Sequence, residues 1–220
     1  GTEEGEAPFW SPDGRFIGFF SGNLLKKLDL TTGTVQVLAD VGIGTANGGA
    51  WAARGDVIYS ANLSGLSHAA ADGGQRQQLT TLDAGHHETR PYWRSMLPDG
   101  DHFLYVVTSD DADTRGLWVS SISDPRTKRR VLPDLSQATY AQGHLLFVRG
   151  GALMAQPFDS VRLSLSGEAR AIVDKVNYNP VLGFGDFSVS EKALAYLPAA
   201  VPWRLTWFDR AGRSLGAFGP

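Results

Sequence analysis

The sequence of 220 residues carries 20 Lys and Arg against 23 Asp and Glu, and a formal net charge of −3 gives no reason to expect a nucleic-acid partner. Its 42% of hydrophobic residues suits a folded domain, and the lack of cysteine excludes disulfides, cysteine-ligated metals and thiolate catalysis. No apolar stretch reaches the roughly 18 residues of a membrane helix, so we expect no membrane insertion.

A strand–turn–strand pattern recurs along the chain. It is clearest where apolar runs flank the Pro-Asp-Gly turns at Pro12 to Gly14 and Pro98 to Gly100, because these residues reverse an extended chain. The other three copies have different turn sequences. The last turn residues of the five copies lie 41, 45, 43 and 49 residues apart, which is the period of a β-propeller: Gly14, Gly55, Gly100, Gly143 and Lys192.

Each copy continues with a second half of the same kind. In the first copy this half runs from Leu25 to Leu38 around a turn at Gly33, and equivalents follow at 66–79, 117–132, 153–173 and 205–218. Four short strands joined by turns make one propeller blade, and no segment has the 3.6-residue period of a substantial helix. The sequence therefore predicts an all-β, five-bladed β-propeller of four-stranded antiparallel blades, with about 20 strands.

These repeats favour a single propeller domain. The approximate blades are 6–40, 47–82, 89–135, 137–175 and 184–219. Packing blades around an axis buries both faces of each blade, so a closed ring would be a compact monomer; the alternative is five blades of a larger propeller. An aromatic residue opens each unit, and we expect these side chains to pack between blades: Trp10, Trp51, Trp93, Tyr140 and Phe187.

The turn sequences also carry a family resemblance. Three segments resemble the TolB-like, WD-repeat-like β-propeller family, whose repeats contain a Trp-Ser-Pro-Asp-Gly type of turn: 10–14, 25–30 and 97–100. Later segments look like the propeller regions attached to bacterial serine/threonine kinases: 145–149, 153–159, 187–190 and 205–209. The resemblance implies a non-catalytic, extracytoplasmic or periplasmic module of a bacterial protein that binds other proteins or ligands. The sequence itself contains no kinase motif.

The stretch from Asp83 to Trp93 leads into the innermost strand of the third unit, and innermost strands line the channel of a propeller. Candidate ligand-binding residues lie here and before the fifth unit: His86, His87, Glu88, Arg90 and Asp186. On a strand, His86 and Glu88 would share a face and could hold a divalent metal if Asp186 or Glu6 supplied a third ligand. The alternatives are a solvated loop that binds nothing and a His–Glu acid/base pair.

Two other patterns carry less weight. The basic run from Arg126 to Arg130 is typical of a charged outer edge that discourages pairing between molecules, with an acidic partner as the alternative. The run from Gly212 to Gly216 matches the spacing of a nucleophile elbow, but no helix follows its serine, so it predicts no catalysis.

We therefore expect a non-catalytic binding or scaffolding module for a protein or small-molecule ligand at the channel mouth. No cofactor is expected, although a divalent metal is left open. The alternative is a glycosidase-like or metal-assisted hydrolase at the same mouth, since five-bladed propellers host glycosidases. That alternative needs carboxylates near the starts of inner strands, and the candidates are few: Glu6, Glu88 and Asp186.

Overall fold

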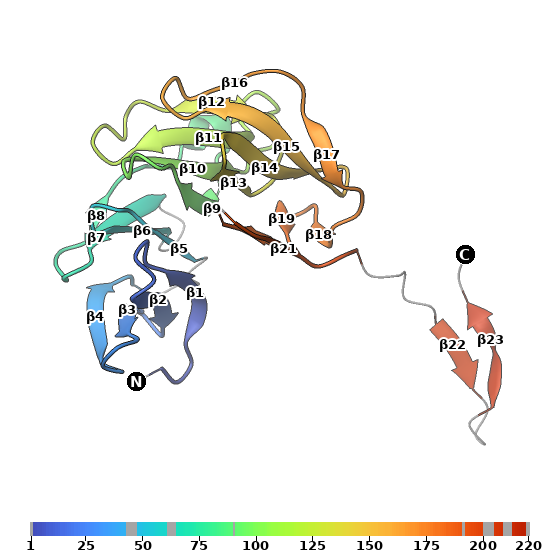
Figure 1. Ribbon diagram of the computed structural model, residues 1–220, viewed down its shortest axis with the longest axis horizontal. Coiled ribbons are helices and arrows are strands. Elements are labelled where there is room, and N and C mark those ends of the chain that lie inside the picture. Colours follow the sequence, from blue (N-terminus) through green and yellow to red (C-terminus); the bar gives the residue numbers. More distant parts are fainter. Residues whose placement is uncertain are drawn as a thin grey trace.

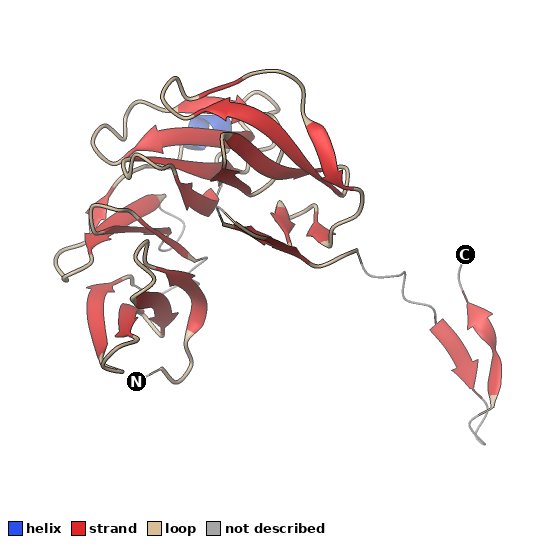
Figure 2. Ribbon diagram, viewed as in Figure 1, coloured by secondary structure: helices blue, strands red, loops and turns tan. Residues whose placement is uncertain are grey.

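The protein is described by a computed structural model that covers residues 2–42, 48–60, 65–89, 91–190, 192–199, 205–208 and 213–218. Within these ranges the chain is almost entirely β (Figure 2), and the helical structure is a single 3-10 turn, η1 (Ala84–His86). The expectation of an all-β fold is confirmed.

Four antiparallel sheets follow one another along the chain (Figure 1). Blade 1 comprises β1 (Glu6–Trp10), β2 (Phe16–Ser21), β3 (Leu24–Asp29) and β4 (Val35–Asp40). Blade 2 comprises β5 (Gly49–Trp51), β6 (Asp56–Ser60), β7 (Leu66–Ala70) and β8 (Gln77–Gln78). Blade 3 comprises β9 (Pro91–Met96), β10 (His102–Val107), β11 (Gly116–Ser121) and β12 (Arg129–Leu132). In blade 4, β13 (Ala138–Ala141), β14 (His144–Arg149) and β15 (Ala152–Asp159) are followed by β16 (Ser164–Leu165) and β17 (Arg170–Val173), which both pair with β15.

Side-chain hydrogen bonds hold the Pro-Asp-Gly turns in place. In blade 1 the Asp13 carboxylate accepts from the Ser11 hydroxyl at 2.6 Å and from the Arg15 amide at 3.0 Å. In blade 3 the Asp99 carboxylate accepts from the amides of Asp101 and His102, both at 2.9 Å. The glycine of each turn has φ near +69°, a backbone conformation that other residues adopt at a cost. The turns therefore fix where each second strand begins.

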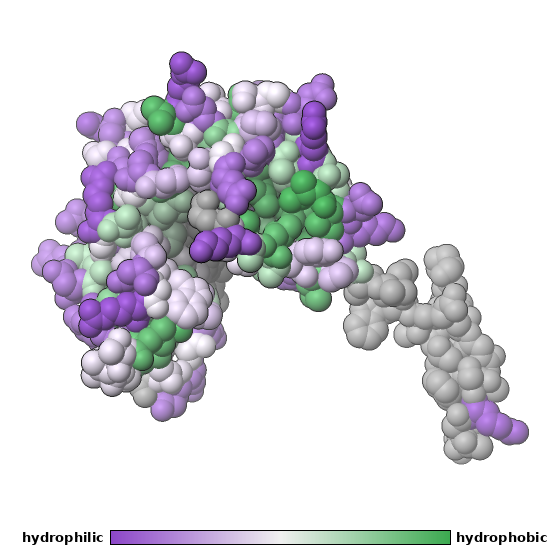
Figure 3. Space-filling model, viewed as in Figure 1, coloured by the Kyte–Doolittle hydropathy of each residue, from purple (hydrophilic) through white to green (hydrophobic). Residues whose placement is uncertain are grey.

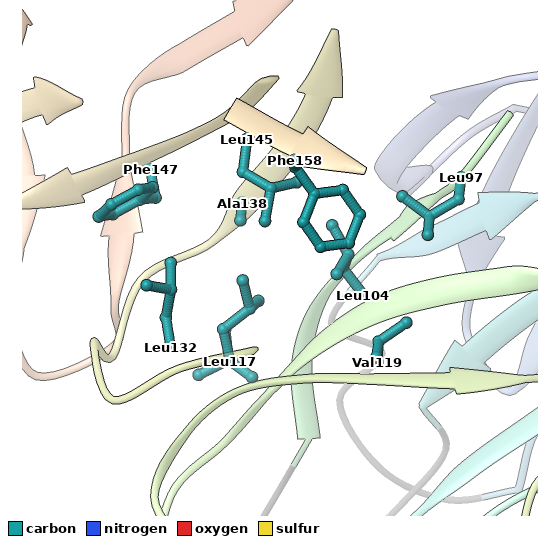
Figure 4. Close-up of a cluster of buried hydrophobic side chains, with 10 residues drawn as sticks. Leu97, Leu104, Leu117, Val119, Leu132, Ala138, Leu145, Phe147 and Phe158 are labelled. Atoms are coloured by element: carbon teal, nitrogen blue, oxygen red, sulfur yellow. The ribbon is translucent and has the colours of Figure 1, made fainter. Parts of the chain in front are cut away.

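The blades pack face to face. The first strands of the blades lie side by side in chain order, with β5 beside β1 and β9, and β13 beside β9. A hydrophobic core fills each interface, and the one between blades 3 and 4 joins Leu104 and Leu117 to Leu145 and Phe158 (Figure 4). Blades that pack face to face, with their first strands side by side, are the arrangement of a propeller.

Some of the aromatic residues that open the units pack between blades as expected, and one does not. Trp51 is buried and its ring centroid lies 6.2 Å from that of Phe9 in blade 1, as expected. Tyr140 and Phe187 lie against the cores on either side of blade 4. For Trp10 the expectation is wrong, because its side chain is 63% exposed: alternation along β1 turns Phe9 inward and Trp10 outward. The side chain of Trp93 lies outside the described part of the chain.

The fifth unit does not form a four-stranded sheet. Its strands form two separate hairpins, β20 (Phe187–Val189) with β21 (Leu194–Tyr196), and β22 (Leu205–Phe208) with β23 (Ser214–Phe218). A further small hairpin, β18 (Tyr178–Asn179) with β19 (Phe184–Gly185), precedes them. Figure 1 shows the β22–β23 hairpin, in red, apart from the other sheets. The described residues therefore form four complete blades, and those of the fifth unit form two separate hairpins.

Candidate functional site

The candidate residues between β8 and β9 lie on a connection that is not a strand. Asp83 caps the 3-10 turn by accepting from the Gly85 amide at 2.9 Å, and His87 ends it in the left-handed conformation with φ of 51°. The expectation that His86 and Glu88 share a strand face is therefore wrong. A short acidic side chain that binds a nearby backbone amide favours a turn over an extended strand.

Each of the two histidines has its own acidic partner. The Nδ1 atom of His86 lies 2.9 Å from Oδ2 of Asp83, and Nδ1 of His87 lies 2.8 Å from Oδ1 of Asp110 in the β10–β11 link. The hydrogen bond that the His86 ring donates to the Asp83 carboxylate, and then the charge of that carboxylate, raise the pKa of His86, while the same hydrogen bond lowers the pKa of Asp83. The Ser109 hydroxyl also donates to the His86 carbonyl at 2.6 Å, so this part of the connection is tied to blade 3.

Glu88 is bound differently, to a lysine. Its side chain is only 5% exposed, and its Oε1 atom lies 3.0 Å from Nζ of Lys128. Its Oε2 atom accepts from the Asp83 amide at 2.9 Å. Lys128 in turn lies over the ring of Trp118, with Nζ 5.4 Å from the ring centroid. The carboxylate is thus held from two sides inside the interface of blades 2 and 3.

A small pocket of about 240 Å³ lies at this point. Its apolar wall comes from Leu79 and Leu82 of the connection and from Tyr105 and Val107 of β10. Burial raises the pKa of Tyr105 well above its ordinary value of 10, and the charge of Glu88 adds to the effect. The polar lining consists of threonines and charged residues: Thr80, Thr81, Thr89, Glu88, Arg126 and Lys128. Polar and charged residues therefore surround one side of this hollow.

The other predicted site residues are not brought to this pocket by the structure. Asp186 lies between β19 and β20, where its Oδ2 atom accepts from the Asn177 side-chain amide at 2.5 Å. Glu6 lies on β1, and Arg90 lies outside the described residues. In the described ranges no three His, Asp or Glu side chains come together as metal ligands. Metal binding by His86 and Glu88 therefore remains an untested prediction.

Sequence reasoning missed Lys128, Tyr105 and the threonines of the pocket. Lys128 belongs to the basic run that was interpreted as a charged edge. Nothing local in the sequence signals that one cation of this run reaches a carboxylate 40 positions earlier. Only the fold of blade 3, which places the β11–β12 link against the connection before β9, brings the two together.

A second hollow, of about 320 Å³, lies between blade 4 and the β20–β21 hairpin. Its lining is mostly apolar and includes Leu146, Ala155 and Ile172 from blade 4 and Val189 and Leu194 from the hairpin. We call this hollow the apolar groove. Figure 3 shows a continuous hydrophobic area in this part of the surface.

Proteins similar to this chain were found among solved structures. No family model matches the sequence, and no curated protein matches it. A solved protein described as TolB, from Agrobacterium tumefaciens, superposes with a TM-score of 0.65 at 20% identity, covering 97% of this chain and 80% of its own. The chain has a TolB-like β-propeller fold. The resemblance found in the sequence is thereby confirmed at the level of the fold.

Other TolB-like or related propellers superpose almost as well. A chain of a nidogen/laminin complex gives a TM-score of 0.61 at 14% identity, covering 98% of this chain and 80% of that chain. The calcium-binding protein regucalcin from Agrobacterium tumefaciens gives 0.58 at 15% identity, covering 97% and 73%. At these identities the likeness concerns the fold alone. No helix in the described ranges is long and apolar enough to cross a membrane.

Proposed function

We propose that this TolB-like propeller is a non-catalytic binding module that holds a small polar ligand in the pocket between blades 2 and 3. The observation that carries the proposal is the Glu88–Lys128 ion pair in the wall of that pocket, with Glu88 almost fully buried. A charged pair in the wall of a hollow supplies polar groups that can fix the orientation of a ligand.

The lining of the pocket indicates the chemistry of the ligand. Threonine hydroxyls both donate and accept hydrogen bonds, Glu88 accepts, and Lys128 and Arg126 donate. The apolar wall from Tyr105 and Val107 would contact a carbon skeleton. At about 240 Å³ the pocket is below the usual range for drug-sized ligands, which favours a small hydroxyl-bearing or acidic molecule.

The placement of the carboxylates favours binding over hydrolysis. A glycosidase needs two carboxyl groups facing each other across the scissile bond, at a separation of about 5 to 9.5 Å. Here Glu88 is paired with Lys128, and Asp186 accepts a hydrogen bond from Asn177 on another element. Both carboxylates are thus engaged with groups that stabilise their charge. The hydrolase alternative has no comparable support.

Three further proposals concern the partner, the compartment and the oligomeric state of the protein. We propose that the module also has a protein partner, as the channel-mouth hypothesis implies, and that it works in an extracytoplasmic compartment. We further propose that the chain is monomeric if its blades close into a ring. These points concern the setting of the module and do not affect the experiment on the pocket.

The proposal is tested by ligand binding to the purified chain. Monosaccharides, free amino acids and small dicarboxylates are screened at about 10 mM for a rise in melting temperature, followed by calorimetry. We expect one class to bind and Glu88→Gln to change its affinity at least about tenfold, because the variant removes the one negative charge of the lining with little change of shape: a hydroxyl-bearing ligand should bind more weakly and an acidic ligand more tightly. Glu168→Gln, the same change at an exposed position of blade 4, is the control.

Two outcomes would overturn the proposal. One is the absence of any ligand that stabilises the parent protein, or equal binding by Glu88→Gln and the parent. The other is hydrolysis of p-nitrophenyl glycosides by the parent that disappears in Glu88→Gln, since this would make the site catalytic.

A further inference from the structure

We propose that the apolar groove and the free edge of β21 are the docking site of the β22–β23 hairpin of the same chain. In this arrangement β22 adds to β21 as the third strand of blade 5, and β23 becomes its outer strand. The inference concerns a surface outside the pocket between blades 2 and 3, so it does not depend on the proposed ligand.

The hydrogen bonds of β21 show which of its edges is open. Ala193 and Leu197 direct their backbone groups to the β20 side, since the Ala193 carbonyl accepts from Ser190 and the Leu197 amide donates to Asp186. Neighbouring residues of a strand point to opposite edges, so the amides and carbonyls of Leu194 and Tyr196 point away from β20. Among the described strands, β21 pairs with β20 alone.

The surface beside this edge is apolar. Ile172 of β17 is 47% exposed, and Leu194, Tyr196 and Leu197 of the hairpin region are also exposed large hydrophobic residues. On the other side of blade 4 the same strands are covered by blade 3 (Figure 4). The side that faces the groove is covered only in part by described residues, namely by the β18–β19 and β20–β21 hairpins and the segment before them. Exposed apolar side chains beside an apolar groove offer a surface on which an apolar strand can pack.

The β22–β23 hairpin has the properties of that partner. Its strands read Leu-Thr-Trp-Phe and Ser-Leu-Gly-Ala-Phe, which are apolar enough to cover a sheet face, and the described strands pair only with each other. In every complete blade the second strand pairs with the third: β2 with β3, β6 with β7, β10 with β11 and β14 with β15. Pairing of β21 with β22 would repeat this arrangement.

The connection is long enough for the hairpin to reach β21. Residues 197–204 separate β21 from β22, a link of eight residues. The link between β10 and β11, residues 108–115, has the same length and already makes this turn inside blade 3. An antiparallel pairing would bring the C-terminal end of β22 beside the N-terminal end of β21.

The absence of cysteine allows a direct test by spin labelling. Labels are placed at Ala195→Cys in β21, an exposed position that does not line the groove, and at Arg213→Cys, just before β23, and their separation is measured by double electron–electron resonance. Docking predicts a narrow distribution centred below about 25 Å, because paired strands lie about 5 Å apart and the labels add the rest. Ile172→Asp, at the groove, should lengthen and broaden it. Val161→Asp, at a 90% exposed valine outside the groove, should leave it unchanged.

Two results would contradict docking within the chain. A long, broad distribution in the parent that Ile172→Asp does not alter would show that the groove does not hold the hairpin. A short distance that is lost on mixing with excess unlabelled protein, together with a dimer in light scattering, would show that the hairpin docks on a second copy instead.

Discussion

The ammonium nitrogen of Lys128 lies 3.0 Å from Oε1 of Glu88 and ties the connection that leaves blade 2 to the residue that precedes the outer strand of blade 3. The two partners differ in exposure, with Glu88 at 5% and Lys128 at 36%. Because of this difference, we expect loss of the Lys128 side chain to destabilise the protein more than loss of the Glu88 charge.

Lys128→Met should destabilise the protein by about 1–3 kcal/mol, because it leaves a nearly buried carboxylate without its cation. Glu88→Gln should cost less, because the amide keeps an acceptor for the Asp83 amide and the lysine can be hydrated. Urea unfolding of both variants measures the difference. Equal losses, or a larger loss for Glu88→Gln, would contradict the prediction.

The contact of Phe9 with Gly49 predicts a strict size limit at the interface of blades 1 and 2. A Cβ atom added at Gly49 would lie 2.5 Å from the Phe9 ring, so Gly49→Ala should destabilise by about 1–3 kcal/mol. The smaller side chain of Phe9→Leu should recover part of this loss in the double variant. Additive losses in a double-mutant cycle would show that the two positions do not contact.

Removal of the hydroxyl group should change the stability of the protein differently at Tyr59 and at Tyr178. Tyr59 is fully buried, its hydroxyl has no hydrogen-bond partner among the described residues, and burial raises its pKa to about 12. Tyr59→Phe should therefore be neutral or stabilise the protein by up to about 1 kcal/mol. The Tyr178 hydroxyl donates to the Leu135 carbonyl at 2.7 Å, so Tyr178→Phe should cost about 0.5–1.5 kcal/mol. Thermal and urea unfolding of the two variants compare them.

The pair of His86 and Asp83 predicts a defined pH window. The pKa of His86 is raised above 6.5, so its stabilising interaction is complete below that pH and is lost as the pH rises through the raised pKa. The pKa of Asp83 is lowered below 3.8, so its contribution is complete above that pH and is lost as the pH falls through the lowered pKa. The pair is therefore fully formed between about pH 3.8 and 6.5.

Asp83→Asn removes the negative charge beside His86 but keeps the capping hydrogen bond, because asparagine also accepts from the Gly85 amide. The variant should lower the titration midpoint of the His86 ring, measured by NMR, while the 3-10 turn persists. An unchanged midpoint would show that Asp83 does not hold the proton on His86.

The sequence was most informative where local signals repeat. Alternation and the Pro-Asp-Gly turns at Asp13 and Asp99 are local, and they correctly predicted the strands of the complete blades. They could not decide whether Phe9 or Trp10 faces the next blade, because that depends on how neighbouring sheets pack. Strands of two residues, such as Tyr178–Asn179, are too short to show any alternation, and the β18–β19 hairpin was not predicted.

The pocket that we propose as the site contains one residue selected from the sequence, Glu88, and it lies there for a different reason than expected. Glu88 was selected as a channel-facing strand residue, whereas it faces a pocket between blades from an irregular connection. Its partner Lys128 could not be assigned from sequence, because only the fold of blade 3, which places the β11–β12 link against the connection before β9, brings the two side chains together. Asp186 was selected by the same channel argument, and the structure places it beside Asn177 instead.

The open edge of β21 also bears on how the protein behaves at high concentration. Unpaired backbone groups beside exposed apolar side chains form a template on which strands of other molecules can add, which is the first step of fibre growth. A chain that ends before Leu205 should therefore aggregate into assemblies that bind amyloid dyes, while the full chain should not. The last hairpin would then protect the protein from its own sheet edge.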